Sequence, residues 1–394
     1  MDLKIYLKNN KISILIFLII IFQNPIWPLW NIEPLNISFA FVFILFIFLI
    51  KKIGQAFVKS KVFIGFCLLL ICFFLFPLFL GFSFSNIVYI LTFLLIHTIS
   101  DNQLDKAFFW LSRYFAIVLL ISFLPWTVNT FISPLFPVWG ELDLSVMKGA
   151  EYPMSNYLFY VSPIHHQMAS LRFYSMFDEP GVVGTLAAFI LYGNKYNFKK
   201  WEVKIIMIIS LFTYSMAFYF LTAVGFAYQR VRKLNQILST MMILITIAFT
   251  LNVLYRTVPE FQTLIVERIN NASDNLDSRT NEMAKKKLES LEGTSEYFLG
   301  IGKDAMLNSG FKQGQSYELF ILEKGFMAVL ILLFCYYTFI RKKDIDSLFL
   351  LLLFFLSFLQ RPFLFTAWQM LIFACCSAHI KLENLRLKNN SIST

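Results

Sequence analysis

Residues 34–50 read PLNISFAFVFILFIFLI, an apolar run that ends at the basic pair Lys51 and Lys52. Similar runs recur along the chain, in which 58% of the 394 residues are apolar and 15% are charged. A soluble protein of this size carries far more charge. The composition therefore predicts an all-α polytopic membrane protein, with residues 1–394 as a single integral membrane domain.

About twelve apolar runs are candidates to cross the roughly 30 Å of bilayer hydrocarbon. They cover residues 12–30, 34–50, 62–82, 86–99, 107–128, 181–193, 205–216, 218–229, 237–255, 317–340, 347–361 and 363–380. Several of them are shorter than the roughly 20 residues of a standard span. The runs at 205–216 and 218–229 are either two segments or one long tilted helix, and this alternative changes the number of spans.

The lysines and arginines predict the orientation. With twelve spans, every basic cluster falls on the side of the N-terminus: Lys4/Lys8/Lys11, Lys51/Lys52/Lys59/Lys61, Lys195/Lys199/Lys200/Lys204, Arg230/Arg232/Lys233, Arg341/Lys342/Lys343 and Lys381/Arg386/Lys388. Cytoplasmic loops are enriched in these residues, so both termini are expected in the cytoplasm. The net charge of +10 is thus a topology signal, and no nucleic-acid partner is expected.

The N-terminal run and the cysteines have ordinary explanations. Three lysines before an apolar run resemble a secretory signal peptide, but Gln23-Asn-Pro-Ile-Trp-Pro contains no small-x-small cleavage site, which favours an uncleaved first helix. All five cysteines lie inside predicted spans, so they indicate small core residues and no disulfide framework.

Two segments are too long to be simple connectors, and both are predicted on the outer side. The first long loop covers residues 129–180 and the second covers residues 256–316. Within the second, Asp277 or Ser278 can cap a helix whose apolar residues recur at helical spacing up to Leu291. Long loops in a compact protein are usually functional or disordered, so these two are the candidates for function.

The first loop carries the candidate residues His165, His166, Arg172, Asp178 and Glu179, the last two just before a Pro-Gly pair that opens a span. A guanidinium grips phosphate or carboxylate through a planar fork and keeps its charge in low dielectric. Ordinary alternatives remain open. Arg172 can pair with a neighbouring carboxylate, the two carboxylates can cap the following helix, and the histidine pair can belong to a turn.

The second loop carries several cations, of which Arg256, Arg279 and Lys303 are candidates, and its closing segment contributes Gln315 and Tyr317. The sequence Gly-Ile-Gly-Lys ending at Lys303 does not have the spacing of a phosphate-binding P-loop, so its glycines predict tight backbone turns near a ligand. No cluster has the spacing of a zinc or calcium site, so no bound metal is expected.

Two segments resemble a known family. RFYSMFDEPGVVGTLAAFIL, from Arg172, is similar to the arginine–phenylalanine–glutamate–proline segment of bacterial O-antigen polymerases and of related capsule and exopolysaccharide polymerases. GIGKDAM and GQSYELFILEKGFMAVLIL resemble the segment that closes their large periplasmic loop. Related O-antigen ligases carry a His-Asn pair where this chain has Gln315-Ser316. The resemblance therefore implies a polymerase of lipopolysaccharide biosynthesis in the bacterial inner membrane, with its long loops in the periplasm.

Such polymerases join oligosaccharide repeat units carried on undecaprenyl diphosphate, which is the substrate that the resemblance implies. It further implies that Arg172, Arg279 and Arg256 stabilise the diphosphate leaving group without metal, and that Glu179, Asp178 or His166 is the base. The remaining candidates for the substrate site are His165, Lys303, Gln315 and Tyr317. The diphosphate linkage is already activated, so no cofactor is expected. The implied partners are the lipid-linked oligosaccharide, the bilayer and a chain-length regulator protein.

Three alternatives remain. In a metal-dependent membrane glycosyltransferase, Asp178 and Glu179 would coordinate a divalent ion. An O-antigen ligase is disfavoured by Gln315-Ser316. A polysaccharide flippase or transporter should carry ionisable residues near the membrane midplane, whereas His97 and Arg113 lie close enough to the cytoplasmic side to snorkel.

Overall fold

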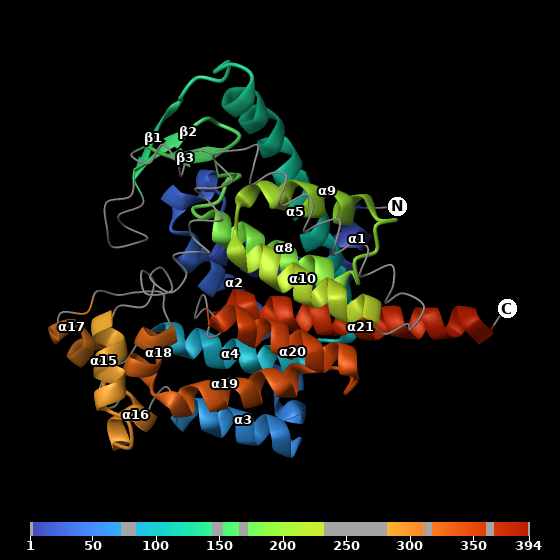
Figure 1. The fold of residues 1–394 in the computed structure, drawn as a ribbon. Coiled ribbons are helices and arrows are strands. Elements are labelled where there is room, and N and C mark those ends of the chain that lie inside the picture. Colours follow the sequence, from blue (N-terminus) through green and yellow to red (C-terminus); the bar gives the residue numbers. More distant parts are fainter. Residues whose placement is uncertain are drawn as a thin grey trace. The chain divides into compact units, whose positions relative to one another are not determined.

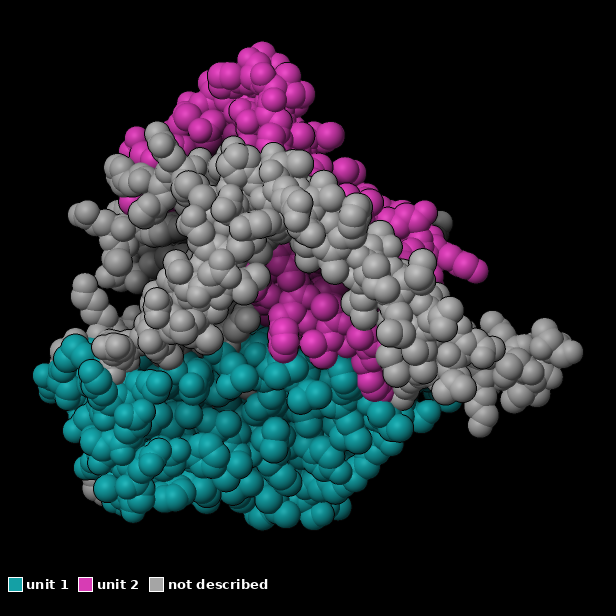
Figure 2. Space-filling model, in the orientation of Figure 1, with its two compact units in different colours: residues 1–111, 279–394 teal, residues 112–278 magenta. Residues whose placement is uncertain are grey.

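The structure is a computed structural model that describes residues 3–71, 84–143, 153–164, 172–231, 282–309, 311, 317–359 and 366–392. The described part is mostly helical and forms two compact units (Figure 2). Unit 1 comprises residues 1–111 and 279–394, and unit 2 comprises residues 112–278. Helix α5 (Asp101–Phe131) begins in unit 1 and ends in unit 2.

Unit 1 is a helical bundle in which segments far apart in the sequence pack together (Figure 1). Besides the start of α5, it contains α1 (Leu3–Gln23), the 3-10 helix η1 (Trp27–Ile32), α2 (Pro34–Phe57), α3 (Ser60–Leu70), α4 (Phe84–Thr98), α15 (Glu282–Ser290), α16 (Ser295–Leu299), α17 (Lys303–Asn308), α18 (Tyr317–Lys324), α19 (Phe326–Phe339), α20 (Ile345–Phe358) and α21 (Ala367–Ile392). Helix α21 packs against α1, α4, α19 and α20. Apolar residues line these contacts, with Phe339, Phe354 and Phe373 buried around Tyr336.

Helices α18 and α19 meet at a bend of 103°. Gly325, at the bend, has a φ of 81°, and Gly300 packs against it with a φ of 82°. A Cβ on either glycine would collide with backbone atoms of the other segment. The Ile301 amide donates to the Leu322 carbonyl at 2.8 Å and the Gly302 amide to the Glu323 carbonyl at 3.1 Å. Gly300, one of the two glycines that the sequence predicted to permit tight turns, and Gly325, which was not among them, thus allow a backbone segment to bond to a bent helix pair.

Unit 2 contains the end of α5, a small sheet and three further helical segments. The sheet is antiparallel, in the order β1 (Gly140–Asp143), β2 (Pro153–Asn156), β3 (Val161–Pro163), and the helices are α8 (Pro180–Gly193), α9 (Trp201–Ser210) with the 3-10 turn η4 (Leu211–Thr213), and α10 (Met216–Val231). In the register of the sheet, Glu141 lies opposite Ser155, which in turn lies opposite Ser162. Every residue of α8 is buried, and both α9 and α10 pack against it.

Most predicted apolar runs coincide with helices. The run at 237–255 lies wholly outside the described residues, as do residues 72–82 of the run at 62–82 and residues 363–365 of the last run. The run at 317–340 is divided by the bend between α18 and α19, and the segment 205–229 is divided between α9 and α10. By length and composition, α2 and α5 are each able to cross a membrane among the described residues, and the bent pair would make a third. The apolar helices indicate membrane association, while the number of twelve spans stays a prediction.

The two long loops contain more regular structure than the sequence indicated. The helix predicted up to Leu291 is present as α15, although its predicted caps, Asp277 and Ser278, lie outside the described residues. The sheet in the first loop was not predicted, because strands of three or four residues such as GELD and VSP carry no alternating pattern.

Candidate functional site

Residues 172–179 of unit 2 connect the sheet to α8 and contain three of the predicted site residues. The segment is held by two buried aromatic rings. The ring of Phe173 contacts those of Phe123 and Trp126, with centroids 5.6 and 5.3 Å away. The ring of Phe177 lies 5.9 Å from that of Phe115. The two rings, four residues apart, therefore hold the segment on α5, while Arg172, Asp178 and Glu179 stay half-buried.

Ser175 fixes the middle of this segment. Its φ is 56°, in the left-handed region that few non-glycine residues adopt. Its hydroxyl donates to the Ser122 hydroxyl at 2.9 Å, and its carbonyl accepts from the Val161 amide at 2.9 Å. These two bonds connect the segment to α5 and to β3, so its shape is set by neighbours as well as by its own residues.

The guanidinium of Arg172 binds the end of a helical turn. Its Nε donates to the Thr213 carbonyl at 3.2 Å and its Nη2 donates to the Tyr214 carbonyl at 3.3 Å. Both carbonyls lie where η4 ends and where Tyr214 turns into the left-handed region, with a φ of 46°. Carbonyls at a helix end carry partial negative charge, which a guanidinium stabilises. Arg172 therefore has a structural partner at the break between α9 and α10.

Glu179 occupies the N-cap position of α8, with extended backbone at φ −145° and ψ 136°. Its carbonyl accepts from the Val182 amide at 3.2 Å, but its carboxylate makes no capping hydrogen bond to the backbone of α8. Pro180 follows at the first helical position, where a missing amide costs nothing. The structure thus places the Glu179 charge where the helix dipole favours it, without a side-chain capping hydrogen bond.

Helix α8 begins close to the break that Arg172 binds. A Cβ on Gly184 would lie 2.7 Å from the Ser215 Cβ and 2.8 Å from the Phe218 Cβ, so the backbone of α8 approaches the start of α10 very closely. Gly184 is about one and a half turns beyond Glu179. Since Ser215 directly follows the carbonyl partners of Arg172, α8 packs beside the helix break that the guanidinium binds.

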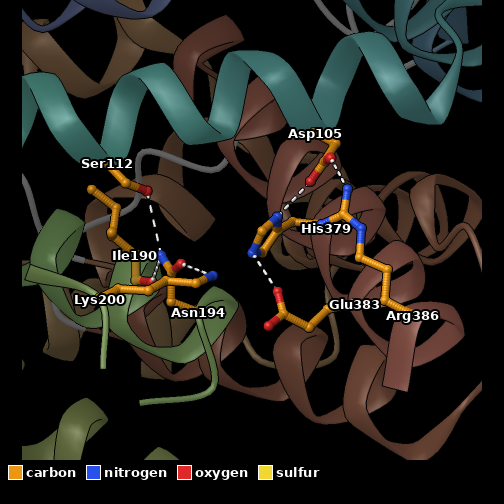
Figure 3. Close-up of polar contacts among 8 residues, drawn as sticks. All are labelled: Asp105, Ser112, Ile190, Asn194, Lys200, His379, Glu383 and Arg386. Carbon is orange, nitrogen blue, oxygen red and sulfur yellow. Dashed lines mark hydrogen bonds and ion pairs between the residues drawn. The ribbon is translucent and has the colours of Figure 1, made fainter. Parts of the chain in front are cut away.

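A hydrogen-bond cluster fixes the other end of α8 (Figure 3). The side-chain amide of Asn194 donates to the Ser112 hydroxyl at 3.3 Å and to the Ile190 carbonyl at 3.0 Å. Its side-chain oxygen accepts from Lys200 Nζ at 2.9 Å. These contacts connect α8 to α5 and to the segment before α9, so the helix that carries Glu179 is held at both ends.

Two of the other predicted site residues lie in unit 1. Lys303 and Tyr317 begin α17 and α18, which belong to unit 1. The remaining five, His165, His166, Arg256, Arg279 and Gln315, lie outside the described residues. Their predicted roles stay predictions.

Unit 1 contains a polar cluster that the sequence did not reveal (Figure 3). His379 lies between two carboxylates, with its Nδ1 2.5 Å from Asp105 Oδ1 and its Nε2 3.1 Å from Glu383 Oε2. Arg386 Nη2 lies 3.0 Å from the second oxygen of Asp105. Ionised carboxylates only accept hydrogen bonds, so both ring nitrogens donate and His379 is an imidazolium while both carboxylates are charged.

A second set of charges in unit 1 continues this cluster along α5 and α21. Lys381 Nζ lies 2.5 Å from Asp101 Oδ2, and Arg341 Nε lies 3.6 Å from Asp101 Oδ1. Arg341 also donates to the Ile96 carbonyl. His379 and Glu383 are four residues apart on α21, a spacing that places two side chains on one face of a helix, but the sequence analysis did not identify them. The partner Asp105 is 274 positions away from His379, so no such spacing indicates it.

Asp344, between α19 and α20, is the N-cap of α20 and accepts from the Ser347 amide at 2.9 Å. Its other oxygen accepts from Asn384 at 3.1 Å and lies 3.8 Å from Lys342 Nζ. Burial raises the pKa of the Asp344 carboxyl, but these hydrogen bonds and the lysine lower it by more, so the pKa lies below its usual value.

Within the described ranges, no group of three or more His, Cys, Asp or Glu side chains is placed to hold a metal ion. The chain was also compared with known proteins. No protein-family model, no curated protein and no solved structure matches it.

Proposed function

We propose that this protein is a membrane glycosyltransferase that polymerises undecaprenyl-diphosphate-linked oligosaccharide repeat units, at the periplasmic face of the bacterial inner membrane. The observation that carries the proposal is the segment 172–179, in which half-buried Asp178 and Glu179 directly precede the buried helix α8 and Arg172 binds the helix break before α10. Half-buried charged side chains are costly to desolvate, so a group of them in one short segment is a candidate for contact with a polar substrate.

In the proposed reaction, the acceptor is a sugar hydroxyl at the non-reducing end of a lipid-linked unit, and the donor is the growing chain on its carrier. The hydroxyl oxygen forms a bond to the anomeric carbon of the donor, and the bond from that carbon to the diphosphate oxygen breaks. Glu179 accepts the hydroxyl proton, with Asp178 and His166 as the next candidates. The diphosphate leaves with the bonding electron pair, and arginines stabilise its charge.

Arg172 has two tasks in this proposal. Its bonds to the Thr213 and Tyr214 carbonyls orient the guanidinium, and a planar fork with five N–H donors is able to bind a diphosphate oxygen as well. Arg279 and Arg256 are proposed to contribute from the second long loop. An apolar bilayer-facing surface suits the polyprenyl tail of the substrate.

The test is chain extension in nanodiscs with lipid-linked repeat units. We expect Glu179→Gln to abolish extension without loss of fold, because an amide does not accept the proton. The matched control is Glu141→Gln, which changes an exposed carboxylate in the same unit and should extend chains normally. Full activity of Glu179→Gln would remove Glu179 as the base.

Two further arms separate the alternatives. Wild-type protein that loses activity in chelator would be a metal-dependent enzyme, with Asp178 and Glu179 as ligands. Transfer of a single unit without a ladder of longer chains would indicate a ligase. We also expect Arg172→Lys to lose extension, since a point charge reproduces neither the two carbonyl bonds nor the bidentate grip.

A further inference from the structure

The connection between α5 and β1 in unit 2 exposes an unusually apolar surface. The exposed side chains are Phe131, Ile132, Leu135, Val138 and Trp139. We call these five residues the apolar ridge. Ile132 is 75% exposed, and Leu135 and Trp139 are each 68% exposed. No charged residue occurs between Arg113 and Glu141. Five exposed large apolar side chains within nine residues indicate an environment other than water alone.

Hydrogen bonds hold the backbone of the ridge in place. The Asn129 side chain binds both backbone groups of Phe136, accepting from its amide at 2.8 Å and donating to its carbonyl at 2.8 Å. At the far end, the Trp139 amide donates to the Asn156 carbonyl of β2 at 2.7 Å. The exposed rings therefore stand on a backbone that is fixed at both ends.

The ridge continues a bilayer-facing surface of α5. Exposed apolar side chains follow that helix at helical spacing, at Ile117, Leu120, Ile121 and Leu124. From Tyr114 to Phe131 the helix rises about 27 Å, close to the roughly 30 Å of bilayer hydrocarbon. The end of α5 at Phe131 thus coincides with the length at which a helix entering near Arg113 leaves the hydrocarbon.

The backbone restricts the depth of the ridge. After Phe131 the chain is irregular until β1, and irregular backbone facing lipid is not tolerated in hydrocarbon, where its polar groups find no partners. Its side chains nevertheless require an apolar environment. The boundary between headgroups and acyl chains satisfies both conditions, and it is where tryptophan is enriched. Pro134 and Pro137 suit this position, since neither has an amide to satisfy.

We infer that the apolar ridge is a lipid anchor, which inserts into the headgroup–acyl boundary of the leaflet where α5 ends. Because the Trp139 amide is bonded to β2, the anchor holds the three-stranded sheet at the surface of that leaflet. The molecules that contact the exposed side chains of the ridge are phospholipids. This inference requires only that α5 crosses the bilayer, and it does not depend on the proposed glycosyl transfer.

The test measures depth by fluorescence quenching. In a cysteine-free version of the full chain, Trp139→Cys and Leu124→Cys are each labelled with an environment-sensitive fluorophore and placed in phosphatidylcholine nanodiscs. The nanodiscs contain lipid with a nitroxide either near the headgroup or near the end of the acyl chain. Glu141→Cys, two residues beyond Trp139 and exposed, is the control for a position in water.

We expect the ratio of shallow to deep quenching to be above one at position 139 and below one at position 124, with aqueous iodide quenching strongest at position 141. Absence of lipid quenching at position 139 would overturn the inference. So would cross-linking of two chains through position 139 in nanodiscs loaded with several copies, since the ridge would then be an interface between copies. Thermal unfolding of each labelled variant in the same nanodiscs identifies any variant that has lost its fold, and Leu135→Cys then replaces Trp139→Cys.

Discussion

The close approach of α8 and α10 makes Gly184→Ala the most direct test of the site. A methyl group at this position would lie 2.7 Å from the Ser215 Cβ and 2.8 Å from the Phe218 Cβ. Both neighbours are Cβ atoms, so they move only if the backbone moves. Alanine is favoured over glycine in a helix by about 1 kcal/mol, whereas an extra methyl group in a tightly packed contact costs about 1–3 kcal/mol. Because the backbone must shift, we expect net destabilisation of about 1–2 kcal/mol.

Gly54 is the matched control. It also lies in the interior of a helix, α2, but a Cβ there meets nothing within 4 Å. Gly54→Ala is therefore expected to stabilise the protein by about 0.5–1 kcal/mol, through helix propensity alone. The same substitution should thus have opposite signs at two helical glycines, and this difference does not depend on the detergent or on the absolute melting temperature.

The assay is thermal unfolding of purified protein in one detergent, followed by the loss of the monodisperse peak in size-exclusion chromatography. Chain extension is measured in parallel, and Gly184→Ala should lower it, since a displaced α10 moves the carbonyls that hold Arg172. A Gly184→Ala protein that melts at or above the wild-type temperature would refute the close packing of α8 on α10.

Two further predictions concern unit 1. His379→Gln should lower the melting temperature strongly, since losing one partner of a buried charged group costs about 3–5 kcal/mol. Arg386→Gln is the control and should have little effect, because that side chain is 61% exposed. Equal shifts of the two melting temperatures would contradict the buried role of His379. Because the pKa of Asp344 is lowered on folding, its stabilising effect is complete above about pH 4 and is lost as the pH falls through the folded pKa. Melting curves from neutral to acid pH should therefore fall less steeply for Asp344→Asn than for wild type, and parallel curves would contradict the assignment.

The elements of the fold were largely predictable because hydrophobicity is a local signal. A long apolar run such as residues 34–50 can satisfy its backbone polar groups in a bilayer only as a helix, and the structure has the helix α2 there. Within 205–229, apolar composition alone does not distinguish one tilted helix from two helices, and only the basic cluster at Arg230 favours a break there. It is decided by contacts with residues distant in the sequence, including the bonds from Arg172 to the Thr213 and Tyr214 carbonyls.

The candidate site was predictable in its residue types and not in its contacts. The cost of desolvating Arg172, Asp178 and Glu179 was visible from the sequence, but the use of Arg172 at a helix end was not. The bonds of Ser175 to Ser122 and of Asp105 to His379 each connect positions far apart in the chain. A single sequence carries no information about such pairs, because a serine or an aspartate has many equivalent partners.

The structural role of Arg172 changes how a loss of activity at this residue should be interpreted. If the guanidinium only held the helix break, Arg172→Ala would act through displacement of α10, and Gly184→Ala would reproduce its loss of stability and of chain extension together. If it also binds diphosphate, Arg172→Lys should lose extension more than its change in stability explains, since lysine keeps a cation near the carbonyls but lacks the planar fork. Plotting extension against melting temperature for the three variants distinguishes these cases. If Arg172→Lys falls on the line through wild type and Gly184→Ala, its loss of extension is explained by its loss of stability. Arg172 would then be a positioning residue that does not bind diphosphate.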